Sequence, residues 1–286
     1  MPYVPTVVST GFRVLSAVSP PLAVRVGART FWRVGPRAAV RDVDRDVHQR
    51  ASRATVHVDG ERVVTYAWGS PDRPAVLLVH GWQLRASRLA PLVVALENAG
   101  MRVVAFDGVA HGESTGRRMS AVEHIATMHA VQAAEGPFTA VVGHSLGGLS
   151  AGLALHEGFA ADRFVSLAAP TGFDAVGATF LRFAGIPDTL HERFCAHVER
   201  TFPGSGPGVR DRLTLTAHPV PEHVSTLFVQ DSGDRMTDPE DAQRLHAAHP
   251  GSELVLTNGL GHNRVLDDPG VHDAVVTHVT APARAR

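Results

Sequence analysis

The chain has 286 residues, of which 44% are hydrophobic and 19% are charged, and its formal net charge is -1. This length and apolar content are sufficient for one large domain with a complete core. The nearly neutral charge gives no electrostatic reason to expect a nucleic acid as a partner. The single cysteine, Cys195, excludes an intramolecular disulfide, so the core has to stabilise the fold.

The sequence contains no run of about 18 uncharged apolar residues, the minimum for a transmembrane helix. Its mildly apolar start is interrupted by Arg13 and by Pro20-Pro21 and has no basic segment before it, so it lacks the pattern of a signal peptide. We therefore predict a cytoplasmic protein with no integral membrane segment.

Residues 1–50 differ from the rest of the chain, because six of their arginines precede the first acid, Asp42, and apolar residues lie between them. We interpret this segment as a basic, helical N-terminal arm. It either packs on the main domain as surface helices, or touches a membrane surface or guards the entrance of the active site. The arginines are Arg13, Arg25, Arg29, Arg33, Arg37 and Arg41.

Residues 51–286 alternate between short apolar runs and amphipathic segments. An Asp59-Gly60 pair between two β-rich runs, at 55–58 and 63–68, predicts a hairpin. The alternation that follows predicts an α/β fold, with a mostly parallel sheet covered by helices on both faces. We expect strands near 75–79, 103–106, 139–142, 163–168, 225–230 and 253–257, and helices near 88–99, 120–134, 238–248 and 269–279 and from about 146.

One stretch, at about 173–221, breaks the alternation. It has helical patches at 178–183 and 190–198, a Pro/Gly-rich loop at 203–208 and no convincing strand. We predict a small helical cap above the carboxyl ends of the strands, where open α/β sheets bind ligands.

The strongest local motif is Gly143-His144-Ser145-Leu146-Gly147-Gly148, between an apolar strand and an apolar helix. A nucleophile on such a sharp turn needs small residues two positions to either side, and Gly143 and Gly147 meet that need. The helix N-terminus that follows favours negative charge near the Ser145 hydroxyl. An incidental serine at a glycine-rich helix start is the alternative interpretation.

A serine nucleophile needs a base, and the base needs an acid that fixes its tautomer. His262 lies in a glycine-containing loop after the last predicted strand, from which it can reach across the sheet; the alternative is a surface histidine. Asp231 and Asp234 both follow the strand at 225–230. We predict Asp234 as the acid because it lies further into the loop, and Asp231 as a turn cap.

Four segments in this order resemble the α/β-hydrolase fold family, in its esterase or lysophospholipase-like branch: His80-Gly81-Trp82, the segment 107–114, the motif around Ser145, and Leu260-Gly261-His262. The resemblance covers about residues 54 to 280. It implies that the backbone N–H groups of Trp82 and Leu146 form an oxyanion hole, and that His80 and His111 support loops near the site. Val109 departs from the family pattern, which has proline there.

We expect His144 to pack under the turn at Ser145 and Cys195 to be an inert thiol. The other histidines lack metal-ligand spacing, so we predict neither a metal nor a cofactor. The predicted activity is hydrolysis of a small acyl ester through an acyl-enzyme intermediate. Perhydrolase or haloperoxidase, carbon–carbon bond hydrolase, thioesterase and acyltransferase chemistry use the same residues, and a non-catalytic binding protein is the alternative of a different class.

Overall fold

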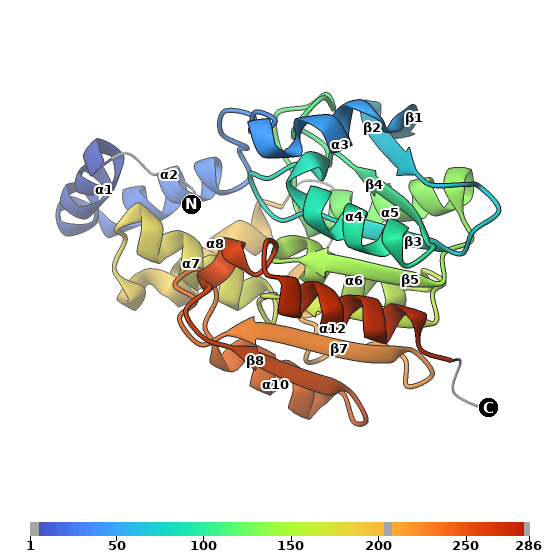
Figure 1. Cartoon of the computed structure of the whole chain (residues 1–286). Coiled ribbons are helices and arrows are strands. Elements are labelled where there is room, and N and C mark those ends of the chain that lie inside the picture. Colours follow the sequence, from blue (N-terminus) through green and yellow to red (C-terminus); the bar gives the residue numbers. More distant parts are fainter. Residues whose placement is uncertain (1–5, 203–207, 283–286) are drawn as a thin grey trace.

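The computed structural model describes residues 6–202 and 208–282. Its eight strands form one sheet in the order β1-β2-β4-β3-β5-β6-β7-β8 (Figure 1). β1 and β2 run antiparallel to their neighbours, and β3 to β8 are parallel. The strands are β1 (Ser52–Val58), β2 (Glu61–Trp68), β3 (Ala75–Val79), β4 (Arg102–Phe106), β5 (Ala140–His144), β6 (Arg163–Leu167), β7 (Ser225–Asp231) and β8 (Glu253–Thr257).

The predicted hairpin and the predicted strands are confirmed. Asp59 and Gly60 join β1 to β2 with φ values of 48° and 82°, as a two-residue turn of type I′ requires. Every residue of β3, β5 and β6 is buried, because helices cover both faces of the sheet there. This burial explains why these strands are continuous apolar runs in the sequence.

Helices cover the sheet on both faces and form two cores. On one face α5 (Ala121–Glu135), α6 (Leu146–His156) and α10 (Glu240–Ala248) pack on residues such as Leu77 and Phe228. On the other face α4 (Ala90–Asn98) and α12 (Pro269–Thr280) pack on Val76 and Leu78. Short helices connect these elements: η1 (Asp42–Asp44), α3 (Arg45–Gln49), η2 (Ala86–Leu89) and α11 (Gly261–Arg264).

The insertion between β6 and β7 is helical, as predicted. It contains α7 (Phe173–Ala184), η3 (Asp188–Leu190), α8 (His191–Arg200) and α9 (Val209–Arg212). Most of the predicted Pro/Gly-rich loop, residues 203–207, lies outside the described residues. Leu181, Phe194 and Val198 are fully buried, so apolar side chains anchor this cap to its surroundings.

The N-terminal arm is helical and packs on the cap. Helices α1 (Thr6–Val18) and α2 (Pro20–Phe31) lie beside α7 and α8 (Figure 1). A Cβ atom on Gly27 of α2 would lie 3.1 Å from Ile186 and 3.4 Å from Phe194, so glycine permits this close approach. The Phe31 ring meets the rings of Phe180 and Phe194 edge-on, with centroids 5.1 and 5.4 Å away. The arm and the cap thus form one helical layer, which the sequence pattern did not indicate.

Across the described ranges, none of the helices combines the length and the apolar character that crossing a bilayer requires.

Candidate active site

The site lies at the point where the strand order reverses. β3 pairs with β4 on one side and with β5 on the other, so the connections that leave β3 and β5 diverge. A crevice opens at such a switch point at the carboxyl ends of the strands. Trp82 follows β3, and Ser145 follows β5.

Ser145 occupies the sharp turn between β5 and α6. Its φ of 56° and ψ of -125° are unusual for a residue other than glycine, and its N–H donates to the Leu167 carbonyl at 2.8 Å. A Cβ on Gly147 would lie 2.3 Å from the Val79 carbonyl oxygen, and one on Gly143 would lie 2.4 Å from the Gly147 carbonyl oxygen. The glycines on either side of Ser145 are therefore required for the strained turn.

The three predicted side chains meet in one hydrogen-bonded chain. The Ser145 Oγ lies 2.9 Å from His262 Nε2, and His262 Nδ1 lies 2.8 Å from Asp234 Oδ2. His262 and Asp234 are buried. They come from the loops after β8 and β7, so parallel strands bring together residues that are 117 and 28 positions apart in the chain.

Asp234 is held as an anion by a full set of donors. Its Oδ2 accepts from Gln230 Nε2 at 3.0 Å and Thr237 Oγ1 at 2.7 Å, and its Oδ1 accepts from the N–H groups of Met236 and Thr237. Burial by itself would raise the pKa of Asp234. The hydrogen bond and electrostatic attraction of His262, with the bonds from Thr237 and Met236, outweigh burial and lower that pKa to about 2.

Asp231 does not contact His262, but it shapes the loop that carries it. Its carboxylate accepts from the N–H groups of Gly233, Leu260 and Gly261 at 2.8–2.9 Å and from the Thr257 hydroxyl. It therefore caps the turn after β7, as predicted, and also fixes the two residues before His262. Burial raises the pKa of Asp231, but the Gly261 and Leu260 N–H donors reverse that effect and leave it below the usual value.

His144 packs beside the triad rather than within it. Its Nε2 lies 2.8 Å from the His262 carbonyl oxygen, and the two rings are 4.9 Å apart. Burial, followed by the nearby His262, lowers the pKa of His144 to about 3, so this ring is neutral near pH 7. The neutral Nε2–H donates to the backbone of His262 and fixes its position.

His80 and His111 support the loop after β3, as the resemblance implied. His80 Nδ1 lies 2.7 Å from the Gly81 carbonyl oxygen, and its Nε2 accepts from the Gly108 N–H at 2.9 Å. His111 Nε2 accepts from the N–H of Gln83, the residue after Trp82, at 3.0 Å. Burial lowers the pKa of both rings, that of His111 to about 3, so each can accept through one nitrogen.

A cavity of about 330 Å³ opens above Ser145 and His262 and is lined mainly by apolar side chains. Phe180 and Phe183 of the cap line it, whereas Leu181, Ile186, Leu190 and Phe194 are buried as anchors. The apolar residues of the cap thus serve two roles, as anchors and as cavity lining. The arm, for which the sequence left a place at the active-site entrance as one interpretation, supplies a second wall made of Val8, Phe12, Phe31 and Trp32. Trp82 and Leu146 lie at the Ser145 end of the same cavity.

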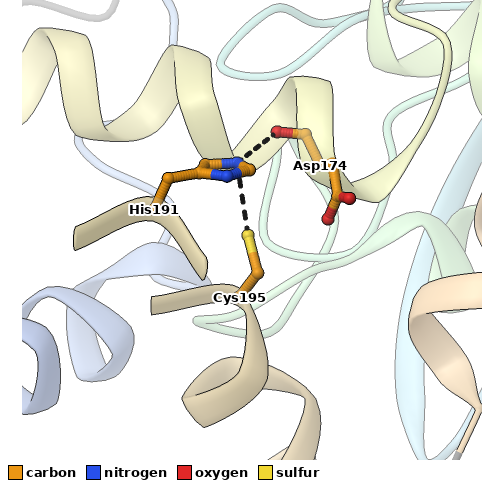
Figure 2. A group of neighbouring side chains, drawn as sticks. All are labelled: Asp174, His191 and Cys195. Atoms are coloured by element: carbon orange, nitrogen blue, oxygen red, sulfur yellow. Dashed lines mark hydrogen bonds between the residues drawn. The ribbon is translucent and has the colours of Figure 1, made fainter. Parts of the chain in front are cut away.

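A second group of polar side chains lies in the cap (Figure 2). Asp174, His191 and Cys195 each have a side-chain atom that could bind a metal ion, and these three atoms all lie within 4.8 Å of one another. The His191 Nε2 lies 3.0 Å from the Asp174 carbonyl oxygen and 3.4 Å from Cys195 Sγ. The Asp174 carboxylate is paired with Arg210 at 2.6 Å. Burial raises the pKa of the Cys195 thiol to about 12. Because the thiol is neutral and the carboxylate is already paired with a cation, we interpret this group as a structural link between α7 and α8 rather than as a metal site.

The fold and the hydrogen-bonded chain define an α/β hydrolase. The model of the alpha/beta hydrolase family matches residues 76–272, so the chain belongs to that family. A search of the curated proteins found no match.

Several solved structures share the fold at low identity. The Pyrococcus furiosus esterase Pf2001 is 18% identical, with a TM-score of 0.64, and the match covers 88% of this chain and 98% of that one. A bacterial membrane phospholipase A is 19% identical (TM-score 0.61, 96% and 98% covered). The monoacylglycerol lipase of Paleococcus ferrophilus is 22% identical (TM-score 0.57, 76% and 98% covered). Likeness at this level supports the fold alone.

Proposed function

We propose that this hydrolase cleaves carboxylic esters through an acyl-enzyme intermediate. Ser145 Oγ attacks the ester carbonyl while His262 Nε2 takes its proton. Asp234 keeps the proton of the neutral imidazole on Nδ1, and it stabilises the imidazolium that forms. His262 then protonates the leaving alcohol, and a water activated by the same nitrogen releases the acid.

The oxyanion of each tetrahedral intermediate needs donors beside Ser145. We assign this role to the backbone N–H groups of Leu146, the first residue of α6, and of Trp82. The His80 and His111 hydrogen bonds hold the backbone on either side of Trp82. Loss of one such donor typically costs about a hundredfold or more in rate.

The observation that carries this proposal is the unbroken hydrogen-bonded chain from Ser145 through His262 to Asp234 at one end of an apolar cavity. Each of the three side chains lies within hydrogen-bonding distance of the next, as proton transfer from Ser145 requires. The strained backbone at Ser145 serves no evident structural purpose. The apolar cavity suits an acyl chain, so we expect medium-chain esters to react faster than acetates.

A fluorophosphonate probe and a panel of p-nitrophenyl esters test the proposal. The probe should label the protein once, at Ser145, and Ser145→Ala should remove both the label and the esterase activity. Labelling of another serine would refute the assignment of the nucleophile. An absence of both labelling and turnover would favour a binding protein with a hydrolase fold.

The same residues support thioester hydrolysis, acyl transfer, perhydrolysis and carbon–carbon bond hydrolysis. Acyl transfer needs an added acceptor and perhydrolysis needs peroxide, so release of free acid in water alone separates hydrolysis from both. Matched ester, thioester and carbon–carbon substrates then show which bond is cleaved fastest, and we expect it to be the ester.

A membrane surface is a second candidate partner, because the arm exposes apolar residues beside arginines. Val14 and Val18 of α1 are 60% and 78% exposed, Leu22 of α2 is 45% exposed, and Arg13 and Arg25 lie nearby in the sequence. Co-sedimentation with anionic vesicles tests this contact. Replacing the two valines with serine should weaken it, and unchanged binding would refute it.

A further inference from the structure

We infer that a subsite for a phosphate group adjoins the ester cavity, so the preferred substrates carry phosphate on the leaving alcohol or thiol. This inference rests on the proposed esterase function and names its substrate class. It comes from a hollow of about 430 Å³ whose charged lining residues are all arginines: Arg33, Arg37, Arg117 and Arg118.

The four arginines are exposed. No ion pair joins any of them to an acid within residues 6–202 and 208–282. Arg37 donates only to the carbonyl groups of Gly112 and Gly116, at 3.5 and 3.4 Å. The guanidinium donors facing the hollow are thus available to an anion.

The backbone forces these like charges together. Arg33 and Arg118 face each other in an antiparallel bridge, which is fixed by hydrogen bonds from Val34 to Arg117 and from Met119 to Trp32. Like charges directly opposite each other in a strand pair are destabilising. A bound dianion would offset that repulsion. Anion binding would therefore explain an arrangement of charges that by itself destabilises the fold.

The hollow adjoins the ester cavity. Arg33 lines both of them. Gly35 lines the hollow, and its Cβ position lies 2.7 Å from the side-chain nitrogen of Gln83, which lines the ester cavity. Gln83 is the neighbour of Trp82. With an ester carbonyl at Ser145 and its acyl chain among the apolar residues of arm and cap, the leaving group can extend past Gln83 towards the arginines.

Carboxylates face a different hollow. Asp59, Glu61 and Glu123 line a neighbouring depression together with Arg117 and Arg118. Glu61 accepts from the Thr115 hydroxyl at 2.5 Å, and Glu123 accepts from the Ser120 N–H at 2.7 Å in the capping box of α5. The charge of Arg33 and Arg37 is therefore not neutralised on the side next to the ester cavity.

Arginine binds phosphate with two parallel hydrogen bonds, which matches the ligand to the lining. Two leaving groups share this chemistry, a glycerol phosphate and a phosphorylated thiol such as coenzyme A. In both reactions the acyl C–O or C–S bond breaks and the hydroxyl of water joins the acyl carbon. The proton goes to the departing oxygen or sulfur, and the phosphate stays intact on the leaving group.

The test compares matched substrates. The first pair is decanoylglycerol and decanoylglycerol phosphate, and the second is the decanoyl thioester of N-acetylcysteamine and decanoyl coenzyme A. For at least one pair, kcat/KM should be higher for the phosphorylated member, and this preference should shrink as salt screens the arginines. Arg37→Gln with Arg118→Gln should lower the ratio of kcat/KM values about tenfold.

Arg73→Gln, an exposed arginine between β2 and β3 that does not line the hollow, is the control and should leave the ratio unchanged. A preference confined to the glycerol pair would assign a lipid headgroup, and one confined to the thioester pair would assign the nucleotide thiol. Neutral esters hydrolysed with no phosphate preference, or a ratio unaffected by the double variant, would overturn the subsite alone. If neither the neutral nor the phosphorylated esters were cleaved, the proposed function would fail instead.

Discussion

Asp234→Asn is the most direct test of the proposed triad, because the structure fixes how the new amide must lie. The Asp234 Oδ1 faces two backbone N–H groups, of Met236 and Thr237, which cannot turn away. The amide oxygen therefore has to take that position, and the amide NH₂ has to point at His262. His262 Nδ1 then becomes an acceptor, so its proton moves to Nε2 and faces the Ser145 hydroxyl.

An imidazole in this tautomer cannot take the serine proton, and the imidazolium loses an anion 2.8 Å away. We expect kcat to fall by about a thousandfold to ten-thousandfold, or about 4 to 5 kcal/mol of transition-state stabilisation. The fold should survive, because the Thr237 hydroxyl can rotate and Gln230 can present its buried Oε1 to the new NH₂; this oxygen has no hydrogen-bond partner among the described residues.

Asp231→Asn is the matched control. Backbone N–H groups face both oxygens of Asp231, so any amide orientation sets NH₂ against a fixed donor. This variant should lose about 1–3 kcal/mol of stability, while kcat falls far less than in Asp234→Asn. Steady-state kinetics on a p-nitrophenyl ester and thermal unfolding of both variants measure the contrast. The reverse ranking of the two kcat values would refute the reasoning.

Three further predictions follow from the cavity and the buried histidines. Phe180→Ala enlarges the cavity and should move the acyl-chain optimum to longer esters, with each added methylene that the cavity accepts contributing about 1 kcal/mol. Phe194→Ala, at an anchor, should mainly cost about 3–5 kcal/mol of stability. An unchanged chain-length profile in the p-nitrophenyl panel would place the acyl pocket elsewhere. Deleting residues 1–18 removes Val8 and Phe12 from the cavity wall and should reduce the preference for medium-chain esters over acetate, and an unaltered preference would show that the arm is only a cover. His111 and His144 have pKa values of about 3, below the usual histidine value, so folding favours their neutral forms. The free energy of unfolding should therefore fall as the pH drops from about 6.5 towards 3, by about 1.4 kcal/mol per pH unit for each ring. A denaturation midpoint independent of pH between 7 and 5 would contradict this.

Much of this protein follows from local sequence. Fully buried parallel strands require apolar runs, so β3, β5 and β6 could be located without a structure. The hairpin at Asp59-Gly60 could be located as well, because its backbone needs positive φ values. The turn at Ser145 is just as local: its close backbone approaches exclude side chains at Gly143 and Gly147, which leaves a readable motif.

Only the tertiary structure decided how distant segments meet. The sequence favoured Asp234 over Asp231 by its place in the loop, but the 2.8 Å contact with His262 across two loops exists only in the folded chain. The structure also gave Asp231 its second role, as the anchor of the His262 loop. No periodicity places α1 and α2 on the cap, because a helix's apolar face does not specify its partner. The cavity wall from Phe12 to Trp32 and the opposition of Arg33 to Arg118 both result from that packing, since long-range contacts are chosen by the shape of the whole assembled core.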